Sequence, residues 1–398
     1  MSAAVPGALA GLRVIEMGQL IAGPFCGQLL GDMGAEVIKI EPPGSGDPMR
    51  SWGRGDRPLW WEVIARNKKS VSIDLRTDAG QALARRLIAT ADILVENFRP
   101  GTLERWGLAP ADLQQATPGL IVVRMSGYGQ TGPYSDRAGF GGIGEAMGGW
   151  RYVVGEPDRP PPRMGVSIGD TLCATYGCLG ALAALNHRHL TGRGQTVDAS
   201  LYESVLQVME SLVIDYSVTG YIRERTGAIL PGLAPSNVYP CADGEVLIGA
   251  NQDSIFARLC EAMGEPALAQ DPRYRTHQDR GRNQAELDEH IGRWTRQHEV
   301  ETVETAMVAH AIPAGRMYRA PDMLADPHFA ARESIVAIDH PTLGTIQMQN
   351  SFPLLSETPG SIRSPAPTHS GAHNDEILRG LLGMTADEIE RLAAAGTI

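Results

Sequence analysis

The sequence contains few cysteines, and their spacing does not indicate a structural or metal-binding role. The five cysteines are odd in number and scattered, and none forms a CxxC pair: Cys26, Cys173, Cys178, Cys241 and Cys260. Disulfide frameworks and zinc sites need paired or regularly spaced cysteines. We therefore predict reduced thiols, a cytoplasmic location and no metal site.

Positive charge and long apolar segments are also scarce. The 398 residues include 35 Lys and Arg against 46 Asp and Glu, a formal net charge of −11, whereas nucleic-acid-binding proteins normally present a basic face. The first residues show no basic region followed by an apolar core, so we expect no secretion signal. The longest apolar stretch, around 171–185, is short for a membrane span and rich in Gly, Cys and Thr. We expect neither a nucleic-acid nor a membrane partner.

The first 125 residues alternate between strand-like and helix-like segments. Strand-like segments occur at 12–16, 36–41, 70–75, 92–96 and 120–125, with helix-like segments at 24–32 and 79–89 between them. This alternation predicts an α/β fold with a parallel sheet covered on both faces. The first turn lacks GxGxxG spacing, so a dinucleotide-binding enzyme is not expected.

The pattern changes in the second half of the chain. Residues 225–330 contain one strand-like segment and a more charged helical region, which together indicate a second, smaller domain. The tail has strand-like pieces at 334–339 and 344–348 and a helical run at 374–395.

Asp170 is a candidate nucleophile. It ends the run GVSIGD (165–170) and precedes the apolar stretch, at the expected start of a helix. A helix N-terminus can keep a carboxylate ionised, and apolar surroundings strip water from it. Such a carboxylate can attack an activated acyl group. From its position alone, an ordinary N-cap residue remains the alternative.

Several short segments, read in order, resemble a known family. They are 12–41, Asn67–Ser70, Glu96–Gly101, Ser126–Pro133, Gly169–Asp170 and Thr191–Gln195. Together they resemble the class III CoA-transferase family, which includes formyl-CoA:oxalate CoA-transferase, succinate–dicarboxylate CoA-transferases and α-methylacyl-CoA racemase. The likeness extends over essentially the whole chain.

The resemblance implies a particular domain organisation. Family members have a Rossmann-like large domain built from both chain ends, a smaller α+β domain, and two subunits that interlock as a homodimer. On this analogy the large domain is 1–205 with 340–398, and the small domain is 225–330. The linkers are 206–224 and 331–339.

The resemblance also implies a reaction. In the transferases, the aspartate at the position of Asp170 attacks an acyl-CoA thioester, and the reaction passes through an acyl-aspartyl anhydride and an aspartyl-CoA thioester. We expect a succinyl-CoA-like donor and a free carboxylic acid, a small dicarboxylate, as acceptor. CoA and acyl-CoA are then substrates, and no permanently bound cofactor is expected. Arg163, Arg316 or Arg319 could pair with the far carboxylate of the acceptor.

Two alternatives to a transferase remain. Racemases of the family place a histidine after an Arg-Ala-Gly step, but here Phe140 follows that step and cannot carry a proton. A racemase or epimerase would therefore lack one of its two bases, which favours the transferase. Outside the enzymes, the alternative is a non-catalytic CoA-binding protein.

The resemblance assigns candidate CoA contacts as well. Asn97, Phe98 and Arg105 match positions that line the CoA channel, and Ile73 matches an adenine-contact position. Arg99 and Arg137 lie near these positions in the sequence and are candidate phosphate partners.

Two departures from the family pattern affect binding. A family arginine that follows the Ile-Lys-Ile-Glu strand falls on Pro42 here, and Arg50 or Arg54 could replace its contact. The glutamine that precedes the Ala-Gly-Pro step in the oxalate enzyme is Ile21 here. We therefore do not expect oxalate specificity, and we assign Ile21 and Phe140 to the substrate pocket.

Overall fold

The computed structural model describes residues 5–56 and 58–398, which form two compact units. The first unit comprises the described residues up to Trp150 together with 163–211 and 331–398, and the second comprises 151–162 and 212–330. The predicted division assigned 151–162 to the large domain and 331–339 to a linker. The contacts instead group these segments with the second and first units, respectively.

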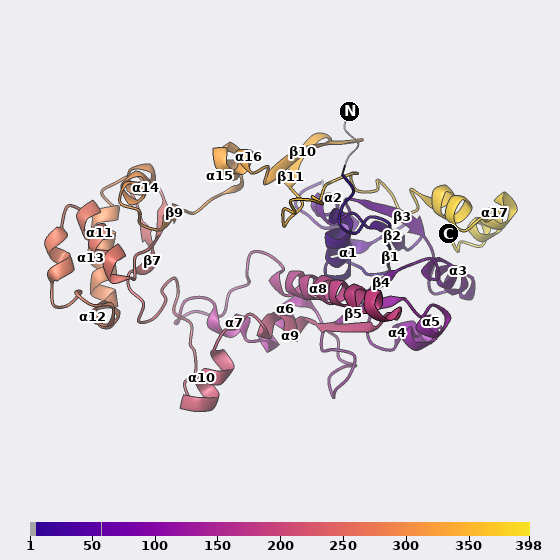
Figure 1. The fold of residues 1–398 in the computed structure, drawn as a ribbon, viewed down its shortest axis with the longest axis horizontal. Coiled ribbons are helices and arrows are strands. Elements are labelled where there is room, and N and C mark those ends of the chain that lie inside the picture. Colours follow the sequence, from indigo (N-terminus) through magenta and orange to yellow (C-terminus); the bar gives the residue numbers. More distant parts are fainter. Residues whose placement is uncertain (1–4, 57) are drawn as a thin grey trace. The chain divides into compact units, whose positions relative to one another are not determined.

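A six-stranded parallel sheet forms the centre of the first unit (Figure 1). Its strands are β1 (Arg13–Glu16), β2 (Glu36–Glu41), β3 (Lys68–Ser72), β4 (Ile93–Glu96), β5 (Ile121–Ser126) and β6 (Thr196–Ser200). Their order is β3-β2-β1-β4-β5-β6, and it reverses direction between β1 and β4. The sheet confirms the predicted α/β class. Ligands of such sheets bind beyond the carboxyl ends of the strands at the reversal.

Alternate strand residues pack into separate cores because successive side chains point to opposite faces. Val14 and Ile93 pack on one face in a core that includes α1 (Ala22–Asp32) and α8 (Ile168–Thr191). Ile15 and Leu94 pack on the other face. That face is covered by α3 (Asp78–Ile88), α4 (Thr102–Arg105), α5 (Pro110–Ala116) and the π-helix η3 (Asp375–Leu381).

Helix α8 is longer than the apolar stretch that predicted it. Its 24 residues pass the length and composition test for a membrane span. Its buried face consists of small residues that belong to the core shared with α1 and the sheet. A Cβ on Gly177 would lie 3.1 Å from the Met125 Sδ atom on β5, so small residues allow this close approach. We therefore regard α8 as a core helix that carries Asp170 near its start.

Shorter elements complete the first unit. They are η1 (Pro48–Ser51), α2 (Trp60–Ile64), α6 (Gly141–Met147), α9 (Leu201–Leu206), β10 (Ile335–His340), β11 (Gly344–Gln349) and α17 (Ala386–Ala394). Strands β10 and β11 form an antiparallel hairpin. The tail then returns to the sheet, where the His373 N–H donates to the Ser70 carbonyl at 2.9 Å and the Asp74 N–H donates to the Thr397 carbonyl at 2.7 Å.

The second unit has its own antiparallel sheet of β7 (Ser236–Pro240), β8 (Glu245–Gly249) and β9 (Ala314–Arg316). Tyr239, Phe256 and Met307 belong to its core. Its helical elements are α10 (Leu212–Thr219), α11 (Asp253–Ala262), η2 (Pro266–Gln270), α12 (His277–Arg282), α13 (Gln284–Thr295), α14 (Val300–Ala309) and α15 (Ala320–Ala325). Helices α7 (Trp150–Val153) and α16 (Pro327–Ala331) cross the unit boundaries.

Candidate active site

A cavity of about 200 Å³ lies at the carboxyl ends of the central strands. Five of the predicted residues line it: Ile21, Asn97, Phe98, Phe140 and Asp170. Ile21 follows β1, and Asn97 and Phe98 follow β4. Phe140 directly precedes α6, and Asp170 lies on α8. The fold thus brings together side chains separated by up to about 150 positions in the sequence, at the place where an α/β sheet binds its ligands.

Asn97 joins the two strands at the reversal point. Its Nδ2 atom donates to the Gln19 carbonyl at 2.9 Å, and its Oδ1 atom accepts from the Gln19 N–H at 2.8 Å. The turn beneath is tight, because a Cβ on Gly18 would lie 2.9 Å from the Gly23 Cα atom and 3.1 Å from the Asn97 Oδ1 atom. Asn97 therefore has a structural role in the cavity wall as well as its predicted role in CoA binding.

Asp170 is the third residue of α8, whose N-cap is Ser167, so it is not the N-cap residue of the alternative interpretation. Its side chain is half-buried, and no hydrogen bond to its carboxylate is found within 5–56 and 58–398. Burial raises the pKa of Asp170 to about 6, with a further contribution from the negative charge of Glu145. The environment thus opposes ionisation, whereas we expected the helix N-terminus to favour it. The carboxylate is still mostly ionised at neutral pH, and no cation among the described residues pairs with it.

Close glycine contacts shape the wall around Asp170. A Cβ on Gly141 would lie 2.0 Å from the Asp170 Oδ2 atom, so the carboxylate occupies the space that a larger residue would fill. A Cβ on Gly127 would lie 2.6 Å from the Gly139 Cα atom. This backbone contact folds the loop after β5 back onto the strand end and places Phe140, which is 57% exposed, in the cavity wall.

A second cavity of about 350 Å³ shares Gln19 and Phe98 with the first. Ile73, the predicted adenine contact, lines it and is buried. Phe98 packs edge-to-face on Trp106, with ring centroids 5.0 Å apart. Arg76 also lines this cavity and was not predicted from the sequence. The two cavities provide adjoining spaces on either side of Phe98.

Three predicted arginines line neither cavity: Arg99, Arg105 and Arg137. All three are exposed. Arg105 donates to the Thr102 Oγ1 atom at 2.9 Å, and Arg137 stacks over Tyr134 with its guanidinium carbon 3.5 Å from the ring centroid. Their roles as phosphate or CoA contacts stay predictions.

The two candidate replacements for the family arginine at Pro42 differ in their surroundings. Arg50 donates to both carboxylate oxygens of Glu41 at 2.7 Å and stacks over Trp61, so internal contacts already engage its guanidinium. Arg54 lines a different cavity from Pro42. Arg76 shares a cavity with Pro42, and its exposed guanidinium donates to both carboxylate oxygens of Asp74, at 2.8 and 2.9 Å.

A third cavity, of about 940 Å³, adjoins the Asp170 cavity through Ile21 and Trp52, which line both. Arg54 and Arg163 also line it, and neither forms an ion pair with another residue of the described chain. Arg316 and Arg319, which were predicted with Arg163 as candidates to bind the far carboxylate, lie in the second unit. Each of them has a carboxylate partner there: Arg316 pairs with Glu304, and Arg319 pairs with Asp322.

Comparisons with known proteins identify the family to which the chain belongs. Residues 9–374 match CoA-transferase family III. The chain belongs to CoA-transferase family III. This confirms the predicted family, and the protein is a CoA-transferase.

The transferase is similar over nearly its whole length to characterised relatives. It is 57% identical to succinyl-CoA–D-citramalate CoA-transferase of Chloroflexus aurantiacus, over 99% of this chain and 98% of the relative. It is 35% identical to succinate–glutarate CoA-transferase of Agrobacterium fabrum, over 97% of each chain.

Solved structures share the fold of the transferase. A CAIB/BAIF family protein from Brucella suis superposes with a TM-score of 0.84 at 32% identity, covering 94% of this chain and 100% of that one. The Rv3272 protein of Mycobacterium tuberculosis gives a TM-score of 0.82 at 28% identity, covering 93% and 99%. The mixed α/β architecture is therefore that of CAIB/BAIF family structures.

Proposed function

We propose that this transferase moves CoA from succinyl-CoA to a small dicarboxylic acid, with Asp170 as the group that carries the acyl and CoA intermediates. The observation that carries this proposal is the half-buried Asp170 carboxylate, without a hydrogen-bond partner in the described chain, on the wall of the cavity at the sheet reversal. The substrates are inferred from the named activities of the similar proteins.

The proposed reaction conserves the energy of the thioester. Asp170 attacks the succinyl-CoA carbonyl, which forms an acyl-aspartyl anhydride and releases the CoA thiolate. The thiolate then attacks the aspartyl carbonyl, which gives an aspartyl-CoA thioester and releases succinate. The acceptor carboxylate repeats these two steps in reverse order and leaves as the new CoA thioester. A poorly hydrated carboxylate suits this role because water would hydrolyse either intermediate.

We place the bound CoA across the two adjoining cavities. The thioester end would lie beside Asp170, and the adenine would lie beside Ile73, with Phe98 in the wall common to both. Arg76 would then contact a phosphate group, because guanidinium groups bind phosphate through paired hydrogen bonds. This assignment places a cation on the cavity where Pro42 replaces the family arginine.

We further propose that the transferase acts as an interlocked homodimer in the cytoplasm. Helix α10 supports the dimer because it contains no buried residue and is strongly apolar, with Val213, Ile214 and Val218 at least 59% exposed. Several exposed apolar side chains on one helix are typical of an interface. A second copy of the chain would cover them. The five free cysteines support a reducing location.

The acceptor is proposed to place its far carboxylate near Arg54 and Arg163, in the cavity that adjoins the Asp170 cavity. With succinyl-CoA as donor, we expect the parent protein to transfer CoA to citramalate, malate or glutarate more efficiently than to butyrate. In the variant Arg54→Met/Arg163→Met, kcat/KM for the dicarboxylates should fall about tenfold or more, because each arginine forms charge-assisted hydrogen bonds. The value for butyrate should be retained.

The acceptor assay distinguishes the reaction from the arginine assignment. In a ping-pong reaction, kcat/KM for the acceptor reports the acceptor half-reaction alone. The exposed Arg193, which lines none of these cavities, provides the control variant Arg193→Met. Absence of transfer to every acid by the parent protein would contradict the proposed function. An unchanged dicarboxylate preference in the double variant would contradict only the role of the two arginines.

The acid limb of the pH profile should report the ionisation of Asp170. Because the ionised carboxylate is the nucleophile and its pKa is raised to about 6, kcat/KM for succinyl-CoA should fall as the pH drops through about 6. Glu145→Gln removes a negative charge that raises this pKa, so the limb should move to lower pH. The control Glu286→Gln, in the second unit, should leave the limb in place. Coincident profiles for all three proteins would argue against Asp170 as the titrating group.

A further inference from the structure

The turn between β1 and α1 contains a residue with an unusual backbone. Leu20 has a φ of +62° and lies in the wall of the cavity that holds Asp170. A left-handed conformation is uncommon for a residue with a side chain and persists only when its surroundings enforce it. Polar contacts to Leu20 and its neighbours therefore determine the shape of this cavity wall.

Asp47 provides the contact to Leu20 itself. Its Oδ1 atom accepts from the Leu20 N–H at 3.1 Å and from the Met49 N–H at 2.8 Å. The Lys39 Nζ atom lies 2.8 Å from the Asp47 Oδ2 atom and donates to the Gly18 carbonyl at 2.7 Å. Asp47 and Lys39 together thus hold the backbone at Leu20 and two residues before it.

Buried charges hold Lys39 in turn. Its ammonium group is 2.8 Å from one Glu16 oxygen, and Lys68 is 2.6 Å from the other. Lys68 also donates to the Pro24 carbonyl at 2.6 Å, inside α1. Burial alone lowers the pKa of Lys39, but the nearby carboxylates, led by Glu16 and Asp47, raise it above its ordinary value. Lys39 therefore keeps its positive charge. Through the bond from Lys68 to Pro24, the network also contacts the backbone after Leu20.

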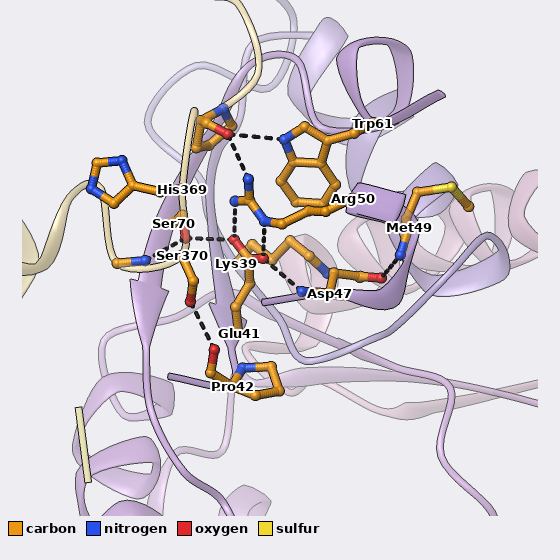
Figure 2. A network of polar contacts seen from close by, with 12 residues as sticks. Lys39, Glu41, Pro42, Asp47, Met49, Arg50, Trp61, Ser70, His369 and Ser370 are labelled. Atoms are coloured by element: carbon orange, nitrogen blue, oxygen red, sulfur yellow. Dashed lines mark hydrogen bonds and ion pairs between the residues drawn. The ribbon is translucent and has the colours of Figure 1, made fainter. Parts of the chain in front are cut away.

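The network extends to the tail of the chain (Figure 2). The Asp47 N–H donates to the Glu41 Oε2 atom at 2.8 Å, and Arg50 binds the same carboxylate. Arg50 also donates to the Pro367 carbonyl at 3.0 Å. Asp47 is thus fixed by groups on several elements and is only 1% exposed. A buried aspartate with this support can hold a strained residue in place.

We propose that Asp47 is a positioning residue for the catalytic cavity. With Lys39, it keeps Leu20 in the left-handed conformation, and this conformation sets the path of the cavity wall from Gln19 to Ile21. Asp47 does not line the cavity and so acts through the backbone of the turn. The tests that measure transfer activity rest on the proposed function, whereas the hydrogen-exchange test does not.

Two substitutions of Leu20 test the role of its conformation without disturbing the buried charges. Glycine adopts a positive φ without strain, whereas β-branched valine strongly disfavours it. We expect Leu20→Val to lower kcat/KM for succinyl-CoA about a hundredfold through misplacement of the wall, and Leu20→Gly to lower it much less. If the side chain itself were what mattered, glycine would be the worse substitution, and that order would overturn the proposal.

Rescue of an Asp47 variant tests the contact directly. We expect Asp47→Ala to lose about a hundredfold in kcat/KM and Asp47→Ala/Leu20→Gly to regain at least about tenfold, because glycine needs no enforcement. The matched control is Asp32→Ala, which removes a buried carboxylate that binds Arg66 and Asn67. It should lower Tm, as Asp47→Ala does, yet leave kcat/KM of the folded protein unchanged. Loss of activity in Asp47→Ala without rescue would overturn the proposal.

Hydrogen exchange provides a measurement independent of transfer. A peptide covering 17–25 should exchange faster in Asp47→Ala than in the parent protein, whereas the same peptide in Asp32→Ala should be unaffected. Unchanged exchange in a folded Asp47→Ala variant would contradict the proposed contact. If Asp47→Ala does not fold, the comparison of Leu20→Val with Leu20→Gly decides. A parent protein without transfer activity would contradict the proposed function, and exchange would still test the contact.

Discussion

Asp170→Asn and Asp170→Ala are expected to abolish CoA transfer while leaving CoA binding largely intact. Removing a nucleophile that forms covalent intermediates eliminates the pathway, so kcat should fall by at least about 10⁴-fold. CoA affinity should change little, because the proposed contacts with the nucleotide lie in the adjoining cavity with Ile73. Transfer from succinyl-CoA, measured by chromatography, and CoA binding, measured by calorimetry, together check this expectation.

A stability measurement separates this effect from unfolding. The folded-state pKa of Asp170 is about 6, above its ordinary value of 3.8, so the folded protein binds more protons than the unfolded chain between these pH values. The contribution of Asp170 to stability therefore falls as pH rises through this window, and at pH 7 the buried charge is destabilising. Asp170→Asn should raise the free energy of unfolding by roughly 2 kcal/mol, allowing for partial exposure. An active Asn variant would contradict the assigned chemistry.

Gly141→Ala is expected to reduce kcat by about a hundredfold or more without unfolding the protein. The added methyl group would lie 2.0 Å from the Asp170 Oδ2 atom, so the carboxylate must move away from its position on the cavity wall. A displacement of about 1 Å can reduce a reaction rate by about a hundredfold. Because the displaced atoms are the end of a side chain and not backbone, Tm should change little.

A second glycine provides the control for that substitution. On η3, a Cβ on Gly380 would meet no described atom within 4 Å beyond its chain neighbours and the backbone of its own helix. Gly380→Ala should therefore leave both kcat and Tm near the parent values. Parental turnover in Gly141→Ala would show that the position of the Asp170 carboxylate does not limit catalysis.

Much of the sheet could be predicted from the sequence because its signals are local. Strand-like segments such as 36–41 form buried parallel strands, and β2 has these same bounds. Residues 201–216 have the pattern of one continuous helix, but the structure divides them into α9 and α10, and Glu210 between the two adopts a positive φ of 54°. Periodicity does not reveal such a break, because the residues on both sides of it remain apolar.

The candidate site was predictable where family segments mark it, and less so where the fold brings distant residues together. Asp170 and Asn97 lie in short segments with recognisable neighbours. Glu145 lies 25 positions before Asp170, and only the packing of α6 on α8 makes its charge relevant. Likewise, Arg76 reaches the cavity of Pro42 through the pairing of β2 with β3. Charge and exposure alone do not distinguish it from other surface arginines.

Mass spectrometry of the protein during turnover tests the central claim most directly. The parent protein mixed with succinyl-CoA and digested at low pH should yield a peptide in which Asp170 carries CoA, and hydroxylamine should convert this group to a hydroxamate. Asp170→Asn should show neither product. If actively transferring protein never carries added mass at Asp170, the acyl and CoA groups do not pass through this carboxylate.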